Sequence, residues 1–203
     1  MAAIQSIIFD LGGVLLNLDT HKTLSAFSQL GFTTVNEHFG IGYADSFFKE
    51  YEIGKITDEQ FIQEALKWCK PGTSQQQVVD AWNSMLLDFP RERVEYLNKL
   101  KNSYSLFLFS NTNTIHMEHF LKSFYAIYGH TMNSLFEKAY YSQIIQLRKP
   151  DVEAFKYVIA DSSVNAASTL FIDDALVNVE GARHAGLQAT HLTGGKTILD
   201  LGL

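Results

Sequence analysis

The sequence predicts an α/β fold in which a parallel five-stranded sheet carries an all-α insertion after its first strand. Short apolar runs end at Asp, Ser or Gly, helical patterns separate these runs after Pro90, and only helical patterns lie between the first run and Pro90. Strands that alternate with helices form parallel sheets with right-handed crossovers. With 203 residues, 46% of them hydrophobic, the chain is long enough to bury such a core.

The first strand is predicted at residues 6–9, where Ser-Ile-Ile-Phe carries no charge before Asp10. Such a run is typical of a strand buried on both faces, and Gly12 and Gly13 mark the turn that ends it. Asp10 is therefore expected at the carboxyl end of the strand, the edge where ligands bind in open parallel sheets. The alternative is a turn aspartate that bonds its own backbone next to the glycines.

Residues 17–89 are expected to form an all-α cap. Two capping boxes mark helix starts in this segment, Thr57 with Gln60 and Ser74 with Gln77. In each box the hydroxyl and the amide side chain three residues later satisfy backbone groups at the start of the helix. The expected helices cover residues 20–30, 43–53, 61–69 and 78–87.

Residues 1–16 and 90–203 are expected to form the core, because helices and strands alternate from Pro90 onwards. Pro150 is well placed as the first residue of a helix, where its missing N–H costs nothing. The expected strands are 105–109, 137–141, 169–172 and 188–192, and the expected helices are 91–101, 151–159, one that begins at residues 110–113 and one that Gly186 ends.

Composition excludes several classes of partner. The formal net charge is −6 and Lys and Arg form no cluster, which argues against a nucleic-acid partner. No apolar run is long enough to span a membrane, and Cys69 is the single cysteine, which suits a reducing compartment. We expect a cytoplasmic protein that is a monomer or a weak homodimer and takes a small-molecule partner.

Polar side chains follow three of the predicted strands. Asp10, Ser110 and the pair Asp173 and Asp174 each come directly after an apolar run, and Lys149 lies on a loop that can reach the same edge. This set predicts a metal site beside a lysine and a hydroxyl. Phosphoryl transfer through an aspartyl-phosphate needs such a set, because Mg²⁺ must screen two anions from each other.

The motifs resemble those of the haloacid dehalogenase (HAD) superfamily in order and spacing. They are Asp10-Leu11-Gly12-Gly13-Val14, Ser110-Asn111-Thr112-Asn113, Arg148-Lys149-Pro150, and Phe171-Ile172-Asp173-Asp174 with Asn178. The resemblance runs from Phe9 to about Leu192 and implies a Rossmann-like core with a small helical cap. Within the superfamily the chain is most similar to sugar phosphatases of the α-D-glucose-1-phosphate phosphatase type.

The resemblance implies a role for each residue that matches a motif. Asp10 would be the nucleophile and a Mg²⁺ ligand, and the carbonyl of Gly12 a second ligand. Asp174 would bind the metal directly, whereas for Asp173 direct binding and support of a ligand both stay open.

The other motif residues would bind the phosphorylated substrate or hold the site in place. Ser110 and the amide of Asn111 would bind phosphate, and Lys149 would bridge phosphate and nucleophile. Asn178 would orient the acidic loop. Asn113 is a further candidate for contact with the substrate.

One position departs from the family pattern. Most phosphatases of this family carry a second aspartate two residues after the nucleophile as general acid and base, and this chain has Gly12 there. Three explanations are open: Asp19 or His116 substitutes, the substrate has a good leaving group, or turnover has been lost. His116 is also a substrate-binding candidate, because its helix begins at the phosphate loop, and Asp19 is another, because it lies near the cap hinge.

Two other functions are alternatives to a phosphatase. A 2-haloacid dehalogenase uses the same aspartate on carbon without Mg²⁺ and also lacks the second aspartate. Against it, the acidic pair would have no metal to bind, and we identify no arginine for a carboxylate substrate. The second alternative is a catalytically idle protein that binds metal and phosphate.

Overall fold

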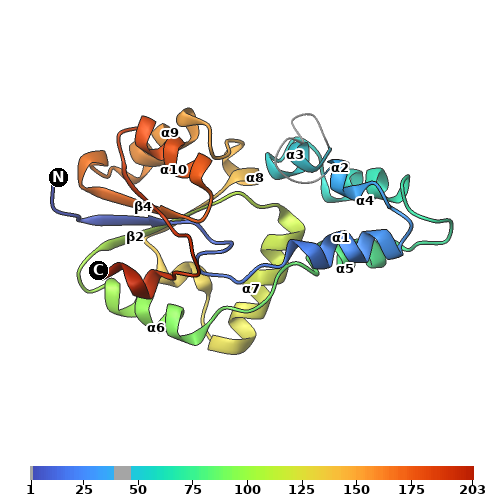
Figure 1. The fold of residues 1–203 in the computed structure, drawn as a ribbon, viewed down its shortest axis with the longest axis horizontal. Helices are drawn as coiled ribbons and strands as arrows, with labels where there is room; N and C mark the ends of the chain where they lie inside the picture. Colours follow the sequence, from blue (N-terminus) through green and yellow to red (C-terminus); the bar gives the residue numbers. More distant parts are fainter. Residues whose placement is uncertain (1, 39–46) are drawn as a thin grey trace.

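The computed structural model describes residues 2–38 and 47–203, which form two lobes joined by two connecting segments (Figure 1). The larger lobe contains the sheet, both described chain ends and the helices that cover the sheet. The smaller lobe is made of helices. In the part of the chain that is described, no helix is both long and apolar enough to cross a membrane.

The larger lobe is built on a five-stranded sheet in which every neighbouring pair is parallel, as predicted. The spatial order is β3-β2-β1-β4-β5, so β1 lies in the middle. All four residues of β1 are buried, which explains its apolar sequence. The strands are β1 Ser6–Phe9, β2 Ser105–Ser110, β3 Lys138–Tyr141, β4 Thr169–Asp173 and β5 Gln188–His191.

Helices cover both faces of this sheet. On one face Ile7 and Phe9 of β1 pack with side chains of α6 and α7, and on the other Ile8 packs with side chains of α9 and α10. Alternate residues of a strand point to opposite faces, so one apolar run supplies both cores. These helices are α6 Arg91–Leu100, α7 Thr114–Tyr128, α9 Val152–Ser162 and α10 Leu176–His184.

The smaller lobe has an apolar core of its own. Phe27, Phe61 and Trp82 are almost completely buried there. Both predicted capping boxes are present, at Thr57 and at Ser74. The helices are α1 Thr20–Gln29, α2 Val35–His38, α3 Phe47–Glu52, α4 Asp58–Leu66 and α5 Gln75–Asn83. The helix predicted at residues 43–53 corresponds to α3, and its predicted start at residue 43 lies outside the described residues.

The two connections between the lobes pair with each other, and this pairing ends α5 earlier than predicted. The helix stops at Asn83 instead of residue 87, because the chain beyond it runs beside residues 17–19. The amide of Leu87 donates to the carbonyl of Asn17 at 3.0 Å, and the amide of Asn17 donates to the carbonyl of Asp88 at 2.9 Å. The lobes are therefore joined by a short antiparallel ladder.

The remaining differences from the predicted elements are local. Pro150 was wrongly predicted as the first helical residue: it lies in a turn, in which the Asp151 amide donates to the Arg148 carbonyl at 3.1 Å, and α9 begins at Val152. Short elements not predicted are α2 Val35–His38, α8 Ser142–Ile145 and the 3₁₀ turns η1 Met132–Leu135, η2 Ala166–Ser168 and η3 Ile198–Leu201.

Candidate active site

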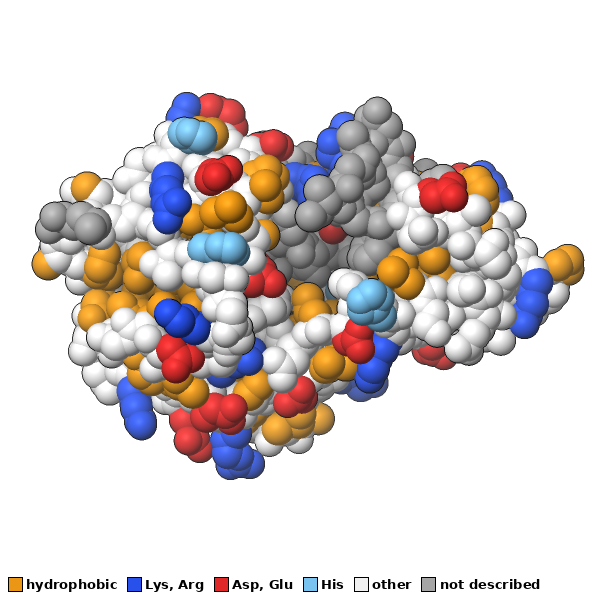
Figure 2. Space-filling model, in the orientation of Figure 1, with side chains coloured by type: hydrophobic (Ala, Val, Ile, Leu, Met, Phe, Trp, Pro, Cys, Tyr) orange, Lys and Arg blue, Asp and Glu red, His pale blue; other side chains and the backbone are white. Residues whose placement is uncertain are grey.

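A cavity of about 750 Å³ lies between the lobes, at the carboxyl ends of the strands. Figure 2 shows the molecule hollowed between its two lobes. Ser110, Asn111 and Lys149 line the end of the cavity at the sheet, and the aliphatic side chains of Leu18, Leu24 and others line its walls. The carboxyl edge of the sheet therefore faces a cleft, as expected for a binding site of an α/β fold.

Lys149 joins two of the predicted carboxylates. Its ammonium donates to Asp10 Oδ1 at 2.6 Å and to Asp173 Oδ2 at 2.7 Å, and the side chain is 1% exposed. Carboxylate oxygens of Asp10, Asp173 and Asp174 all lie within 4.8 Å of one another. The fold thus brings Asp10 close to Lys149, Asp173 and Asp174. Asp10 and Asp174 are 164 positions apart in the sequence (174 − 10).

Burial and the charges of neighbouring groups shift the pKa values of three members of this site. Burial, with the nearby charge of Asp173, raises the pKa of Asp10 from 3.8 to about 7, although Lys149 opposes the shift. Burial alone would lower the pKa of Lys149, but the charges of Asp10 and Asp173 outweigh it, so this pKa is raised. Desolvation and the charge of Asp173 also raise the pKa of Asp174. A bound cation would offset the negative charge of these carboxylates and lower their pKa values.

Asp173 and Asp174 have different surroundings. Asp173 is fully buried, and both its oxygens accept hydrogen bonds: from the Ala175 amide at 2.8 Å, from Asn178 at 3.1 Å and from Lys149. Asp174 is exposed. Its carboxyl lies so close to Gly13 that a Cβ there would collide with it, and Gly13 has a φ of +73°.

These surroundings fit a divalent metal ion. Hard cations such as Mg²⁺ take carboxylate and carbonyl oxygens as ligands. Three carboxylates face a single ammonium, and Asp174 carries an exposed carboxylate at the open side of the cluster. The donor set therefore suits Mg²⁺, with Asp10 and Asp174 better placed to bind it than the fully bonded Asp173.

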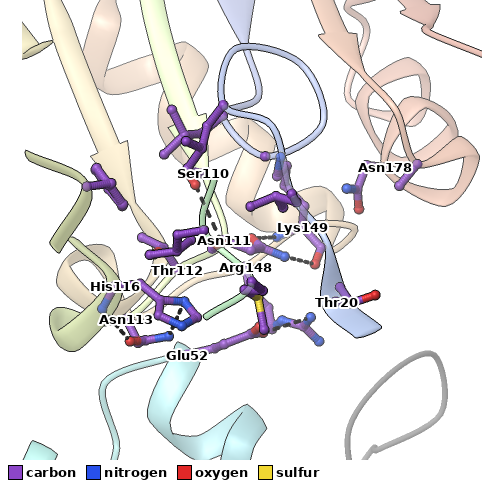
Figure 3. Close-up of a pocket in the computed structure, with 18 of the residues that line it drawn as sticks. Thr20, Glu52, Ser110, Asn111, Thr112, Asn113, His116, Arg148, Lys149 and Asn178 are labelled. Atoms are coloured by element: carbon purple, nitrogen blue, oxygen red, sulfur yellow. Dashed lines mark hydrogen bonds and ion pairs between the residues drawn. The ribbon is translucent and has the colours of Figure 1, made fainter. Parts of the chain in front are cut away.

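The second predicted motif lies at the end of β2, beside Lys149 (Figure 3). The Ser110 side chain is 3% exposed and borders the cavity. Asn111 accepts from the Lys149 amide and donates to the Lys149 carbonyl, both at 2.9 Å. Its side chain therefore fixes the backbone of the lysine loop, a role that the sequence did not indicate. Asn113 accepts from the amide of His116 and is the N-cap of α7.

His116 borders the cavity but both of its ring nitrogens are bonded. Nε2 lies 3.0 Å from the Trp82 carbonyl, which can only accept, so this nitrogen carries the proton. Nδ1 then accepts from Asn113 at 3.1 Å. Burial lowers the pKa of His116 to about 4, and the ring stacks on Trp82 with centroids 4.5 Å apart. A neutral imidazole whose two nitrogens are both hydrogen-bonded is not the missing general acid.

The other candidate for the missing acid, Asp19, caps a helix. Its carboxylate accepts from the His21 amide at 3.1 Å at the start of α1. Asp19 was considered as a general acid or as a helix N-cap, and this geometry supports the N-cap. The hydrogen bond of its carboxylate is to the helix start and not to the acidic cluster.

His116 makes the stability of the fold depend on pH. Its folded pKa lies below its unfolded value of 6.5, so protonation favours the unfolded chain. The free energy of unfolding should therefore fall as pH drops from 6.5 to about 4, by about 3 kcal/mol from this residue. Urea unfolding of the wild type and of His116→Gln at both pH values measures the difference. Equal losses in the two proteins would contradict this assignment.

Contacts between the smaller lobe and the site were not predicted from the sequence. Glu52 of α3 forms an ion pair with Arg148, 3.0 Å from Nη2 to Oε2, and both residues border the cavity. No arginine for a carboxylate substrate was identified from the sequence, whereas Arg148 borders the cavity and is paired there with Glu52. A signal was present, because Arg148 directly precedes Lys149, but its acidic partner depends on how the cap is seated.

The comparisons with known proteins agree with the motifs. A family model described as haloacid dehalogenase-like hydrolase matches residues 7–191. D-ribitol-5-phosphate phosphatase of Bacteroides thetaiotaomicron is 28% identical over 185 residues, 91% of this chain and 90% of that protein.

Two solved structures are similar along almost the whole chain. A HAD family enzyme of Bacteroides thetaiotaomicron, in complex with magnesium and inorganic phosphate, superposes with a TM-score of 0.91 at 32% identity and covers 99% of this chain and 100% of its own. A predicted HAD-like family hydrolase of Porphyromonas gingivalis has a TM-score of 0.87 at 32% identity, over 96% and 94% of the two chains.

Proposed function

This chain belongs to the haloacid dehalogenase-like hydrolases, and we propose that it is a Mg²⁺-dependent phosphomonoesterase that works through an aspartyl-phosphate. The observation that carries the proposal is the buried cluster of Asp10, Lys149 and Asp173, with Asp174 beside it, next to the cavity between the lobes. A buried carboxylate held against an ammonium is arranged for attack on an anionic ester.

The proposed substrate is a small phosphorylated metabolite, a sugar or sugar-alcohol phosphate. The ribitol-phosphate phosphatase relative supports this class, and the neighbour solved with magnesium and inorganic phosphate supports the metal and the product. A cavity of about 750 Å³ has room for a molecule of that size.

Asp10, Asp174 and the carbonyl of Gly12 are the proposed Mg²⁺ ligands. The ion would offset the charge of the carboxylates and of the phosphoryl group. Asp173 is proposed as a supporting residue instead, because its oxygens are already bonded to Lys149, Asn178 and the Ala175 amide.

In the first step Asp10 attacks phosphorus, forming an O–P bond while the bond to the leaving oxygen breaks. Lys149 offsets the charge that spreads over the phosphoryl oxygens, and the hydroxyl of Ser110 donates to one of them. In the second step water attacks the phosphorus of the aspartyl-phosphate, which releases inorganic phosphate and restores the Asp10 carboxylate. The water proton leaves with the phosphate or the solvent.

Residues 17–89 are proposed as the cap and residues 1–16 and 90–203 as the catalytic core. The paired strands at residues 17–19 and 85–88 join the two lobes and are the natural hinge. The aliphatic walls of the cavity come partly from this hinge, at Leu18 and Leu86. A closed cap of this kind excludes water from the ester while the first step proceeds.

Gly12 makes the reaction sensitive to the leaving group. With no carboxylate at this position to protonate the leaving oxygen, kcat/KM, which reports the first step, should fall by about 100-fold or more from phenyl phosphate to a simple alkyl phosphate. A series of small phosphomonoesters with graded leaving-group pKa values, assayed at saturating Mg²⁺, measures the slope. A flat series would show that another residue supplies the proton.

The proposal is tested by phosphate release from a panel of sugar, sugar-alcohol and acyl phosphates, with Mg²⁺ and with EDTA. We expect release that requires Mg²⁺ and favours one sugar or sugar-alcohol phosphate. Halide release from a 2-haloacid in EDTA, without phosphate release, would replace the phosphatase with a dehalogenase. No reaction in either assay would leave an idle binding protein.

A further inference from the structure

We propose that Glu52 of the cap is a positioning residue for both catalytic loops of the core, so that Lys149 and the phosphate loop are fixed in place when the cap is seated. The inference rests on the proposed function for the role of Lys149. It is carried by contacts that residues 51–54 make with the core.

The first contact joins the cap to the lysine loop. The side chains of Glu52 and Arg148 form their ion pair at 3.0 Å while 16% and 21% exposed. Arg148 directly precedes Lys149, and Figure 3 shows it extending from the lysine loop towards Glu52. An ion pair this well buried restrains its partners more than one at the surface does. Movement of the cap should therefore displace Arg148, and with it the adjacent backbone of Lys149.

The second contact joins the same cap residue to the phosphate loop. The Ser142 hydroxyl donates to the backbone carbonyl of Glu52 at 2.7 Å and accepts from the amide of Thr112 at 2.9 Å. Thr112 lies between Asn111 and Asn113 in the loop that follows β2. Glu52 thus reaches one catalytic loop through its side chain and the other through its main chain.

Neighbouring residues of α3 hold Glu52 in this position. The Tyr51 hydroxyl accepts from the Ile115 amide at 3.1 Å, in the first turn of α7. Gly54, with a φ of +67°, packs so closely on the Gln143 carbonyl that a Cβ there would collide with it. The end of α3 is therefore seated on the core at several points, apart from the hinge ladder.

The two loops are also tied to each other, so a change at either contact reaches both. Asn111 bonds the amide and carbonyl of Lys149, and Lys149 in turn holds Asp10. The path from the cap to the nucleophile is then Glu52, Arg148, Lys149 and Asp10, with Asn111 as the link to the phosphate loop. No role for Glu52 was predicted from the sequence.

The test compares Glu52→Gln with Glu50→Gln, a matched control on the exposed side of the same helix. We expect Glu52→Gln to speed amide hydrogen exchange at residues 111–113 and at Lys149 by about tenfold or more, and Glu50→Gln to leave it unchanged. This readout needs no turnover. It therefore decides the inference even if the panel of phosphate esters shows no phosphatase activity.

Kinetics separate positioning from substrate contact. If Glu52 acts through the loops, Glu52→Gln lowers kcat by a similar factor for acetyl phosphate and for the best sugar phosphate, with little change in KM. Arg148→Gln should lower kcat by the same factor, and the double variant Glu52→Gln with Arg148→Gln should lower it no further than either single variant. The exchanged pair, Glu52→Arg with Arg148→Glu, should recover part of the lost kcat. Unchanged exchange in Glu52→Gln, or a loss confined to the larger substrate, would overturn the proposal.

Discussion

Replacement of Asp10 by asparagine should lower kcat by about 10⁴-fold or more, because the amide cannot form the phosphoryl-enzyme. The fold and most Mg²⁺ binding should remain, since an amide oxygen is still a ligand. The structure adds a second expectation. The folded pKa of Asp10, about 7, lies above its unfolded value of 3.8, so ionisation of this buried group destabilises the fold as pH rises through that range.

Asp10→Asn should therefore melt at a higher temperature than the wild type at pH 8 in EDTA. The matched control is Asp19→Asn, because asparagine caps α1 as well as aspartate does. The control should keep both wild-type turnover and wild-type stability. Full activity in Asp10→Asn would contradict the nucleophile assignment, and lost activity in Asp19→Asn would return Asp19 to the list of candidate acids.

Replacement of Lys149 by methionine should damage both activity and stability. Without the ammonium, the buried carboxylates of Asp10 and Asp173 lose their shared partner. We expect a loss of about 3 kcal/mol in the free energy of unfolding in EDTA and a loss of roughly 10³-fold in kcat. Added Mg²⁺ should restore part of the stability but little of the activity, because the ion replaces charge and not the lysine's contact with phosphate.

Lys138→Met is the matched control for this variant. Lys138 forms an ion pair of similar length with Asp161, 2.6 Å, but its side chain is 52% exposed. Its removal should change the free energy of unfolding far less than removal of Lys149 does, and leave turnover unchanged. Thermal unfolding and phosphate release of the two variants, each with and without Mg²⁺, measure the difference. Equal destabilisation by the two variants would contradict the expectation that loss of the buried Lys149 ammonium lowers the free energy of unfolding more than loss of an exposed one.

The sequence predicted the sheet and the convergence of its polar strand ends. Asp10, Ser110 and Asp173 each follow an apolar run, and the topology of a parallel sheet requires their carboxyl ends to share one edge. That inference needs only the order of strands and helices along the chain. It did not need the distances that the structure supplies.

Side-chain roles within the site depended on tertiary contacts that no local pattern encodes. The sequence could place His116 near the phosphate loop, but not the bonds to Trp82 and Asn113 that occupy its nitrogens. The Glu52–Arg148 pair likewise depends on how α3 is seated against the core. Pro150 was misplaced because a turn closes at residues 148–151 before the helix begins.

The central claim is that phosphate passes through Asp10, and the most direct measurement is to trap it there. The enzyme is mixed with phosphorus-labelled acetyl phosphate and Mg²⁺, quenched in acid during turnover, and digested for peptide mapping. Since Gly12 leaves no carboxylate at that position to activate water for the second step, the phosphoryl-enzyme should accumulate. We predict label on the peptide that contains Asp10 and none in Asp10→Asn. Turnover of acetyl phosphate with no labelled peptide, or with label on another residue, would contradict the account.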